Sequence, residues 1–227
     1  MFIKDDTKIQ KLPRIMNSQE KEITYTSSNS YSTLNTLTEQ TKTVWFVCHG
    51  MGYLSHYFLR YFKNLNLEEN YVIAPQAPSK YYIQPRMHVG ANWLTKNNTE
   101  SGTENIINYF DAVLEAEKIP KDANLIVFGY SQGVSVAMRY LAKRKLQCSQ
   151  LVLHSGGIPK ELTAEDFEYL SKDTKVKLIY GTEDEYLDEK RIQLESERAA
   201  DLFGKRVSFM PFEGKHVVNV DYINGLV

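Results

Sequence analysis

The 227-residue sequence predicts an α/β protein with a mostly parallel central sheet flanked by helices on both faces. Short, continuously apolar runs recur along the chain, as expected of strands that are covered on both sides. Segments in which apolar residues recur with helical spacing lie between these runs. Strands that alternate with helices are typical of β-α-β units, which build parallel sheets.

Six apolar runs are predicted to be the strands of this sheet, at residues 43–48, 71–74, 125–128, 151–153, 176–180 and 206–210. Four segments between them have helical periodicity, at residues 54–65, 104–118, 134–141 and 189–203. Nearer the start, residues 22–26 alternate polar and apolar, residues 27–30 are turn-rich and residues 31–37 follow. That pattern predicts an antiparallel hairpin at one edge of the sheet.

Length and composition predict one domain over residues 1–227, with residues 1–20 as a loosely ordered N-terminal extension and no room for a large cap domain. The net charge of -1 gives no general attraction to nucleic acid or to anionic membranes. The apolar runs of the predicted strands reach about five residues, too few for a transmembrane segment. The first residues lack the pattern of a secretory signal, and Cys48 and Cys148 flank apolar runs as buried thiols do. We expect a soluble, cytoplasmic protein.

Ligands of parallel sheets bind at the loops after the carboxyl ends of the strands. One such loop, at positions 129–133, reads Gly-Tyr-Ser-Gln-Gly between a predicted strand and a predicted helix. In the Gly-x-Ser-x-Gly pattern a tight turn exposes the serine hydroxyl, and Gly129 and Gly133 leave room for the neighbouring strand and helix. A serine that only caps a helix would explain Ser131 but not both glycines. Ser131 is therefore predicted to be a nucleophile.

A serine hydroxyl becomes nucleophilic when a base takes its proton, and the chain has five histidines. His216 follows the last predicted strand in a glycine-containing loop that can fold over the strand ends. His56 falls within a predicted helix and His88 within a long loop. His49 and His154 end strands, where a structural role is commoner. His216 is predicted to be the general base.

The base needs an anion that fixes its tautomer and stabilises the imidazolium. The loop after residues 176–180 carries Glu183, Asp184, Glu185 and Asp188. Asp184 is predicted for this role, because its side chain is shorter than that of a glutamate and has one torsion fewer to fix. The other three carboxylates are expected to be solvated neighbours.

Negative charge that develops during acyl transfer needs nearby hydrogen-bond donors. The backbone N–H of Gln132, directly after the serine, is one predicted donor. The loop at positions 49–52, His-Gly-Met-Gly, follows the first buried strand and offers a second, with Met51 as the donor. This loop also fits a simple tight turn, but it lacks the third glycine of a dinucleotide-binding loop.

Together these segments resemble the α/β-hydrolase fold, and within it the phospholipase/carboxylesterase family that includes acyl-protein thioesterases. The matching segments lie at residues 49–52, 75–78, 129–133, 181–184 and 214–216, with Trp93 where that family tends to carry a tryptophan. The order Ser131, Asp184, His216 is the order of this fold. The resemblance implies hydrolysis of carboxylic esters or thioesters through an acyl-enzyme, without a metal or an organic cofactor.

The sequence departs from this family after position 52, where Tyr53, Leu54 and Ser55 replace an acidic residue common in the thioesterases, and in the loop at residues 79–92. The resemblance therefore does not identify the substrate. Tyr53 and Tyr57 lie near enough to the first strand end to wall an acyl pocket, and Trp93 is a third candidate. Aromatic residues at helical spacing around Tyr57 also fit simple core packing.

The sequence as a whole predicts a serine carboxylesterase that acts on a small-molecule ester or thioester, as a monomer or a homodimer. An acyl thioesterase or a lysophospholipase would use the same three side chains. A non-catalytic protein that binds a ligand in the same pocket is the alternative from another class.

Overall fold

The computed structural model describes residues 19–120 and 122–227. One sheet of seven strands has the order β1-β3-β2-β6-β7-β8-β9. Its parallel members are β2 (Thr43–Cys48), β3 (Asn70–Pro75), β6 (Asn124–Tyr130), β7 (Gln150–His154), β8 (Lys175–Gly181) and β9 (Val207–Phe212). At one edge β1 (Tyr31–Leu34) runs antiparallel to β3. The predicted mostly parallel α/β sheet is confirmed.

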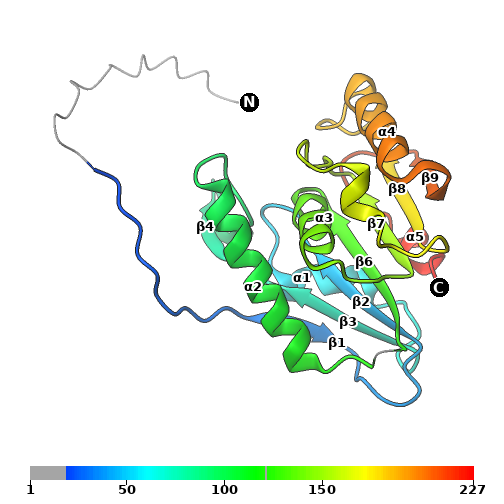
Figure 1. Cartoon of the computed structure of the whole chain (residues 1–227), viewed down its shortest axis with the longest axis horizontal. Coiled ribbons are helices and arrows are strands. Elements are labelled where there is room, and N and C mark those ends of the chain that lie inside the picture. Colours follow the sequence, from blue (N-terminus) through cyan, green and yellow to red (C-terminus); the bar gives the residue numbers. More distant parts are fainter. Residues whose placement is uncertain (1–18, 121) are drawn as a thin grey trace.

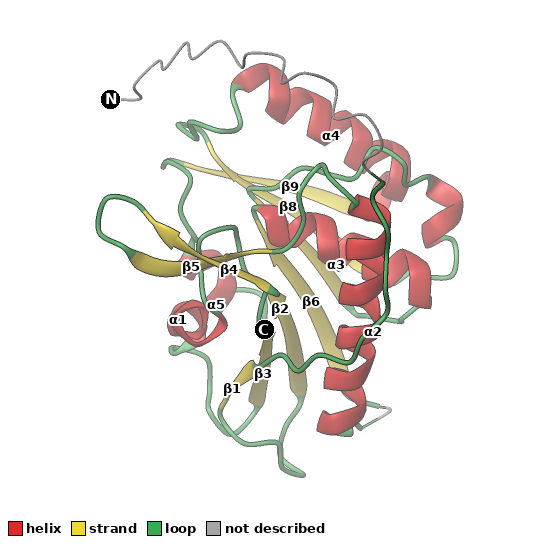
Figure 2. Ribbon diagram, turned by 90° about the vertical axis from the view of Figure 1, so that its left-hand side faces the viewer, coloured by secondary structure: helices red, strands yellow, loops and turns green. Residues whose placement is uncertain are grey.

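Helices cover both faces of this sheet, as Figure 2 shows. On one face lie α2 (Thr99–Glu117), α3 (Gln132–Arg144) and α4 (Glu189–Phe203). On the other lie α1 (Ser55–Phe58), the 3₁₀ turn η1 (Leu59–Phe62) and α5 (Val220–Asn224). Two further 3₁₀ turns are η2 (Ala164–Phe167) and η3 (Gly204–Arg206).

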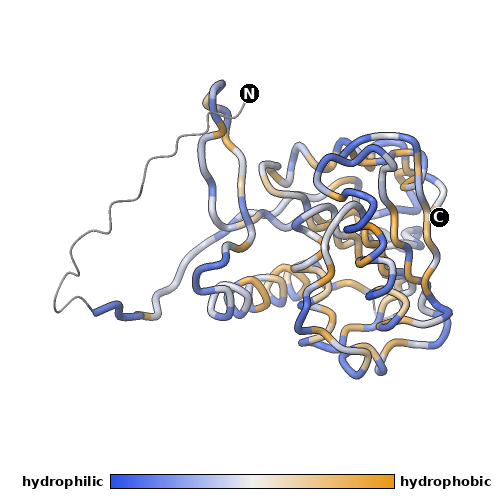
Figure 3. The backbone as a smooth tube through the Cα atoms, turned by 90° about the horizontal axis from the view of Figure 1, so that it is seen from above, coloured by the Kyte–Doolittle hydropathy of each residue, from blue (hydrophilic) through white to orange (hydrophobic). Residues whose placement is uncertain are grey.

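The period of two along β2 divides the core between these faces. Val44, Phe46 and Cys48 belong to the cluster under α2 and α3, whereas Trp45 and Val47 belong to the cluster under α1 and α5. All five are fully buried, which is why the run is continuously apolar. Figure 3 shows the hydrophobic stretches gathered in the body of the molecule.

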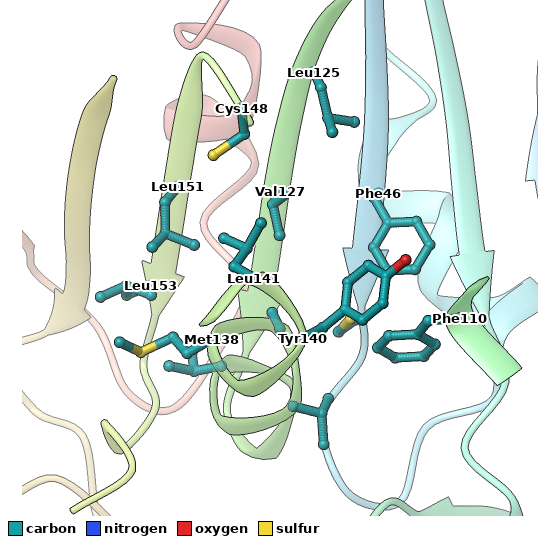
Figure 4. Close-up of a cluster of buried hydrophobic side chains, with 14 of the residues drawn as sticks. Phe46, Phe110, Leu125, Val127, Met138, Tyr140, Leu141, Cys148, Leu151 and Leu153 are labelled. Atoms are coloured by element: carbon teal, nitrogen blue, oxygen red, sulfur yellow. The ribbon is translucent and has the colours of Figure 1, made fainter. Parts of the chain in front are cut away.

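Aromatic packing anchors α2 and α3 to the sheet (Figure 4). Phe110 of α2 meets Phe46 edge to face, with ring centroids 5.0 Å apart, and meets Tyr140 of α3 in the same way at 5.2 Å. Such contacts fix the helix that follows β6, and with it the turn that joins the two.

The predicted loop at residues 79–92 is instead an antiparallel hairpin of β4 (Ser79–Ile83) and β5 (His88–Asn92), which stands out from the body of the molecule (Figure 2). Most of its side chains are exposed, so a pattern of buried residues could not reveal it.

Among residues 19–120 and 122–227, no helix has both the length and the apolar character that crossing a membrane requires.

The predicted N-terminal hairpin is wrong in its first half. Residues 22–26 form no strand, and Ile23 and Tyr25 are 88% and 79% exposed. Alternation without a partner surface does not stabilise a strand, because the apolar side chains find nothing to pack against. The second half is β1, which pairs with β3. Of the expected extension at residues 1–20, residues 1–18 lie outside the described residues.

Candidate active site

The turn between β6 and α3 carries Ser131 at the carboxyl end of the sheet. The serine backbone has φ 52° and ψ −120°, a conformation that residues with a Cβ seldom adopt. Its N–H donates a hydrogen bond of 2.8 Å to the carbonyl oxygen of His154, which fixes the turn against β7. The geometry is that of the sharp strand-to-helix bend expected from the Gly-x-Ser-x-Gly pattern.

Both glycines of this pattern are required because other backbone segments approach them too closely for a side chain. A Cβ on Gly129 would lie 2.5 Å from the Cα of Val134. A Cβ on Gly133 would lie 2.0 Å from the carbonyl oxygen of Cys48. Any side chain at either position would push α3 away from the strands that it packs on.

Three predicted residues from distant parts of the chain meet at this turn. The Oγ of Ser131 lies 3.0 Å from Nε2 of His216, and Nδ1 of His216 lies 2.7 Å from Oδ2 of Asp184. Because a carboxylate only accepts hydrogen bonds, Nδ1 carries the ring proton. Nε2 is then free to accept the proton of the serine hydroxyl.

The carboxylates of the acidic loop after β8 make different contacts. Asp184 is buried, and its Oδ1 accepts the N–H groups of Tyr186 at 2.8 Å and Leu187 at 3.1 Å. Asp188 accepts the N–H of Arg191 and so caps α4. Glu183 is exposed. Asp184 is thus held with its second oxygen directed at the histidine ring.

Two further contacts on His216 were missed by the sequence analysis. Oε2 of Glu185 accepts the His216 N–H at 3.2 Å, and the hydroxyl of Tyr130 donates to the His216 carbonyl oxygen at 3.0 Å. No sequence signal distinguishes them, because Glu185 lies in a run of similar carboxylates and Tyr130 ends a buried strand.

The loop at residues 49–52 passes directly beside the serine. A Cβ on Gly50 would lie 3.1 Å from the Cβ of Ser131. Gly52 donates its N–H to the carbonyl oxygen of Ala91 in β5 at 2.8 Å. Within the described residues, the N–H groups of Met51 and Gln132 have no acceptor. One backbone donor of the serine turn and one of the loop beside it are therefore unpaired among the described residues.

The side chain of Gln132 ties the serine turn to the end of β5. Its Oε1 accepts the N–H of Trp93 at 2.9 Å, and its Nε2 donates to Oδ1 of Asn92 at 2.7 Å and to the carbonyl oxygen of Leu94 at 2.8 Å. The segment that holds Gly52 therefore also holds Gln132, and the two loops share one support.

Two other histidines at strand ends have structural environments. Nε2 of His49 accepts the N–H of Ala77 at 3.1 Å, and Nε2 of His154 accepts the N–H of Asn219 at 2.9 Å. Burial lowers the pKa of His49 to about 4, and burial followed by the charge of His216 lowers the pKa of His154 to about 3. Both rings are therefore neutral at pH 7. The histidines in α1 and β5 are exposed.

The three residues expected around an acyl pocket occupy different environments. Tyr53 is half-buried, and its ring meets that of Tyr130 edge to face at 5.9 Å. Tyr57 is 57% exposed. Trp93 is 2% exposed, and its indole N–H donates to the carbonyl oxygen of His49 at 2.7 Å. Of the three, Tyr53 is the one whose ring contacts the serine turn.

A cavity of about 560 Å³ opens at the amino ends of the strands, where Lys42, Asn70, Asn124 and Asn224 contribute to its lining. Its lining contains none of Ser131, Asp184 and His216, which meet at the opposite end of the sheet. In the part of the chain that the structure describes, no group of three or more His, Cys, Asp or Glu side chains could hold a metal ion.

Comparison with protein-family models shows the family of this chain. A family model described as Phospholipase/Carboxylesterase matches residues 29–224. The comparison with curated proteins finds no match.

Solved structures share the fold at low sequence identity. Acyl-protein thioesterase 2 of Zea mays is 17% identical with a TM-score of 0.66, covering 88% of this chain and 96% of its own. Esterase PE8 is 18% identical with a TM-score of 0.66, over 88% and 97% of the two chains. A phospholipase/carboxylesterase from Dyadobacter fermentans is 20% identical with a TM-score of 0.61, over 89% and 98%.

The fold is that of the α/β hydrolases, and the family model covers most of the chain. The chain belongs to the phospholipase/carboxylesterase family. Family and fold together support a serine hydrolase of the esterase or thioesterase kind.

Proposed function

We propose that the protein is a serine carboxylesterase that works through Ser131, His216 and Asp184. The observation that carries this proposal is the continuous hydrogen-bond chain of 3.0 Å from the Ser131 hydroxyl to His216 and 2.7 Å from His216 to Asp184. A helix-capping serine or a surface histidine would need neither the second bond nor the strained serine backbone.

In the first half of the reaction Ser131 Oγ attacks the acyl carbonyl carbon while Nε2 of His216 takes the hydroxyl proton. Asp184 keeps the imidazole in the required tautomer and stabilises the imidazolium. The tetrahedral oxyanion accepts hydrogen bonds from the backbone N–H groups of Met51 and Gln132. Each such donor contributes about 2.7–4 kcal/mol in the transition state.

Collapse of this intermediate breaks the bond to the leaving group, which departs with the proton held by His216. The product is an acyl-enzyme on Ser131. In the second half, water gives a proton to Nε2 and attacks the acyl carbon. The carboxylic acid leaves as His216 returns that proton to Ser131, so the enzyme is regenerated.

Because the described residues form no large cap domain over the strand ends, we propose an open site for small or flexible acyl groups. Met51 and Tyr186 are 59% and 72% exposed on loops that contribute to the site, and Tyr53 packs beside the serine turn. We propose Tyr53 as an acyl contact. Trp93 is enclosed in the core and is not assigned to this surface.

Labelling with a fluorophosphonate probe tests the proposal. Attack of Ser131 Oγ on phosphorus with loss of fluoride would give a covalent adduct that peptide mapping locates. We expect labelling of the folded wild-type chain, none of Ser131→Ala, and a loss of about 10⁶ in kcat for p-nitrophenyl ester hydrolysis in that variant. A wild-type chain that resists the probe would refute the proposal and favour the alternative of a non-catalytic ligand-binding protein.

Parallel assays with a p-nitrophenyl ester, an acyl thioester and a lysophospholipid address the leaving group. All three substrates would pass through the same acyl-enzyme, so Ser131→Ala is the common control. Preference for the thioester or the lysophospholipid, as the ratio of kcat/KM values, would replace carboxylesterase as the specific assignment and leave the mechanism unchanged.

A further inference from the structure

Side chains, and not the backbone of the sheet, form the hydrogen bonds to the backbone of His216. The regular pairing of β8 with β9 ends at Gly181 and Phe212. Beyond it, Thr182 donates to the carbonyl oxygen of Phe212 at 2.9 Å, and Glu183 donates to that of Gly214 at 2.9 Å. The two loops that carry Asp184 and His216 thus continue the ladder past the ends of their strands.

This ladder stops just before the histidine. Among the described residues, no backbone group pairs with the N–H or the carbonyl oxygen of His216. Glu185 accepts the N–H and Tyr130 donates to the carbonyl oxygen, from opposite ends of the same residue. Without these two contacts, the hydrogen bonds of His216 would be only those of its ring to Asp184 and Ser131.

The rings around His216 add to this restraint. The ring of Tyr130 lies 5.3 Å from the imidazole at an interplanar angle of 34°, and that of Tyr186 lies 4.9 Å away at 70°. Tyr130 is itself 2% exposed and is the last residue of the buried strand β6, so its hydroxyl is presented from a rigid element. Rigid support of this kind is what a base needs for a fixed approach to its nucleophile.

We propose that Tyr130 and Glu185 are positioning residues that clamp the His216 backbone so that Nε2 stays within reach of Ser131. The inference rests on the proposed function, since a histidine without a catalytic role would need no such placement. Neither residue touches the reacting atoms. Both act through the loop that carries the base.

The two halves of the clamp have different chemistry. The Tyr130 contact comes from a buried hydroxyl, which has few competing partners. Glu185 is exposed, and its own backbone N–H, together with that of His216, holds the pKa of its carboxyl below the usual value. Glu185 is therefore ionised at neutral pH, although water competes for its oxygens.

Conservative variants distinguish the loss of these two contacts from a general effect of substitution on the fold or the loop. Tyr130→Phe removes the hydroxyl and keeps the ring. Glu185→Ala removes the acceptor, and Glu185→Gln restores an acceptor oxygen without the charge. Glu183→Gln is the matched control, because Glu183 is exposed in the same loop and its carboxylate has no hydrogen bond among the described residues.

The experiment measures kcat and KM for a p-nitrophenyl ester and the rate of fluorophosphonate labelling in the full chain, with thermal unfolding as a check of folding. We expect Tyr130→Phe and Glu185→Ala each to lower kcat and the labelling rate about three- to tenfold with KM unchanged. Glu185→Gln should recover part of the loss, and Glu183→Gln should match the wild type. The double variant Tyr130→Phe/Glu185→Ala should lose at least the product of the two single effects.

Variants that label at the wild-type rate would overturn the clamp while leaving the proposed function intact. A loss confined to KM, or an equal loss in Glu183→Gln, would also overturn it, since neither follows from misplacement of the base. Failure of the wild-type chain to label would refute the proposed function itself, and the clamp with it. Glu185→Ala is a surface change, so the test holds even if Tyr130→Phe does not fold.

Discussion

Gly133 and Cys48 are in backbone contact: a Cβ on Gly133 would lie 2.0 Å from the Cys48 carbonyl oxygen. Cys48 ends β2, and the loop with Met51 begins one residue later. The first turn of α3 and the loop at residues 49–52 are therefore placed relative to each other by main chain, not by adaptable side chains.

This contact predicts the effect of the smallest possible substitution. Gly133→Ala should lower the free energy of unfolding by about 1–3 kcal/mol or more, because α3 must move off β2. Activity should fall further than stability explains, since the Gln132 donor moves with the helix. Denaturant unfolding and ester turnover measure the two effects. Gly225→Ala, where the new Cβ meets its nearest neighbour at 3.5 Å, is the control that should keep both.

Asp184→Asn should preserve the fold and remove most of the activity. An asparagine amide can hold the ring in the wrong tautomer, with the proton on Nε2, and cannot stabilise the imidazolium. The expected loss in kcat is on the order of 10⁴. Asp188→Asn provides the comparison, because Asp188 caps α4 and lies outside the proposed machinery. Equal losses in the two variants would remove Asp184 from the mechanism.

The buried histidines predict a loss of stability in acid. In the folded chain burial lowers the pKa of His49 to about 4 and that of His154 to about 3, whereas in the unfolded chain both return to about 6.5. Below pH 6.5 the unfolded state therefore binds protons that the folded state does not, so the free energy of unfolding falls as the pH falls. Each histidine contributes up to about 1.4 kcal/mol per pH unit down to its folded pKa.

Urea unfolding at pH 5 and pH 7.5 tests this dependence. The midpoint should be lower at pH 5, and His154→Gln should flatten the difference between the two pH values whatever its effect at pH 7.5. His56→Gln, at an exposed position, should leave that difference as it is in the wild type. An unchanged difference in His154→Gln would show that this ring is not the source.

The aromatic cluster under α2 predicts a large packing cost. Phe110 is fully buried and meets Phe46, Trp93 and Tyr140 edge to face. Phe110→Ala should lower the free energy of unfolding by about 3–5 kcal/mol, as measured by denaturant titration. Leu194→Ala, at a residue of α4 that is 43% exposed, should change it by less than about 0.5 kcal/mol.

The parallel strands and the long helices could be predicted from the sequence because their burial requires a recognisable pattern of apolar residues. A strand that is buried on both faces is a continuous apolar run, and a packed helix has apolar residues at helical spacing. Residues 43–48 and 189–203 match β2 and α4 in both bounds, while β3 and β7 extend one residue beyond their apolar runs at each end. The β4–β5 hairpin has no such pattern, since it buries few side chains. Residues 22–26 gave the opposite error: they alternate like a strand but have no surface to pack against.

The meeting of Ser131, Asp184 and His216 was predictable because each follows a strand of one parallel sheet, and parallel strands end at the same edge. Their hydrogen bonds agree with that expectation. The Glu185 and Tyr130 contacts depend on where a loop directs one side chain, which no spacing encodes. Trp93 was predicted as a candidate for the acyl pocket, but its burial depends on packing against His49, which no spacing encodes.

The two ends of the β4–β5 hairpin differ in how many contacts they make with the rest of the molecule. Near its base, Ala91 and Asn92 hold the loops on both sides of the serine, whereas the turn at residues 84–87 stands clear of the body (Figure 2). A new sequence of equal length at that turn would therefore leave the hydrogen bonds of Ala91 and Asn92 in place. The outer half of the ribbon can vary in sequence while its anchored half keeps its position.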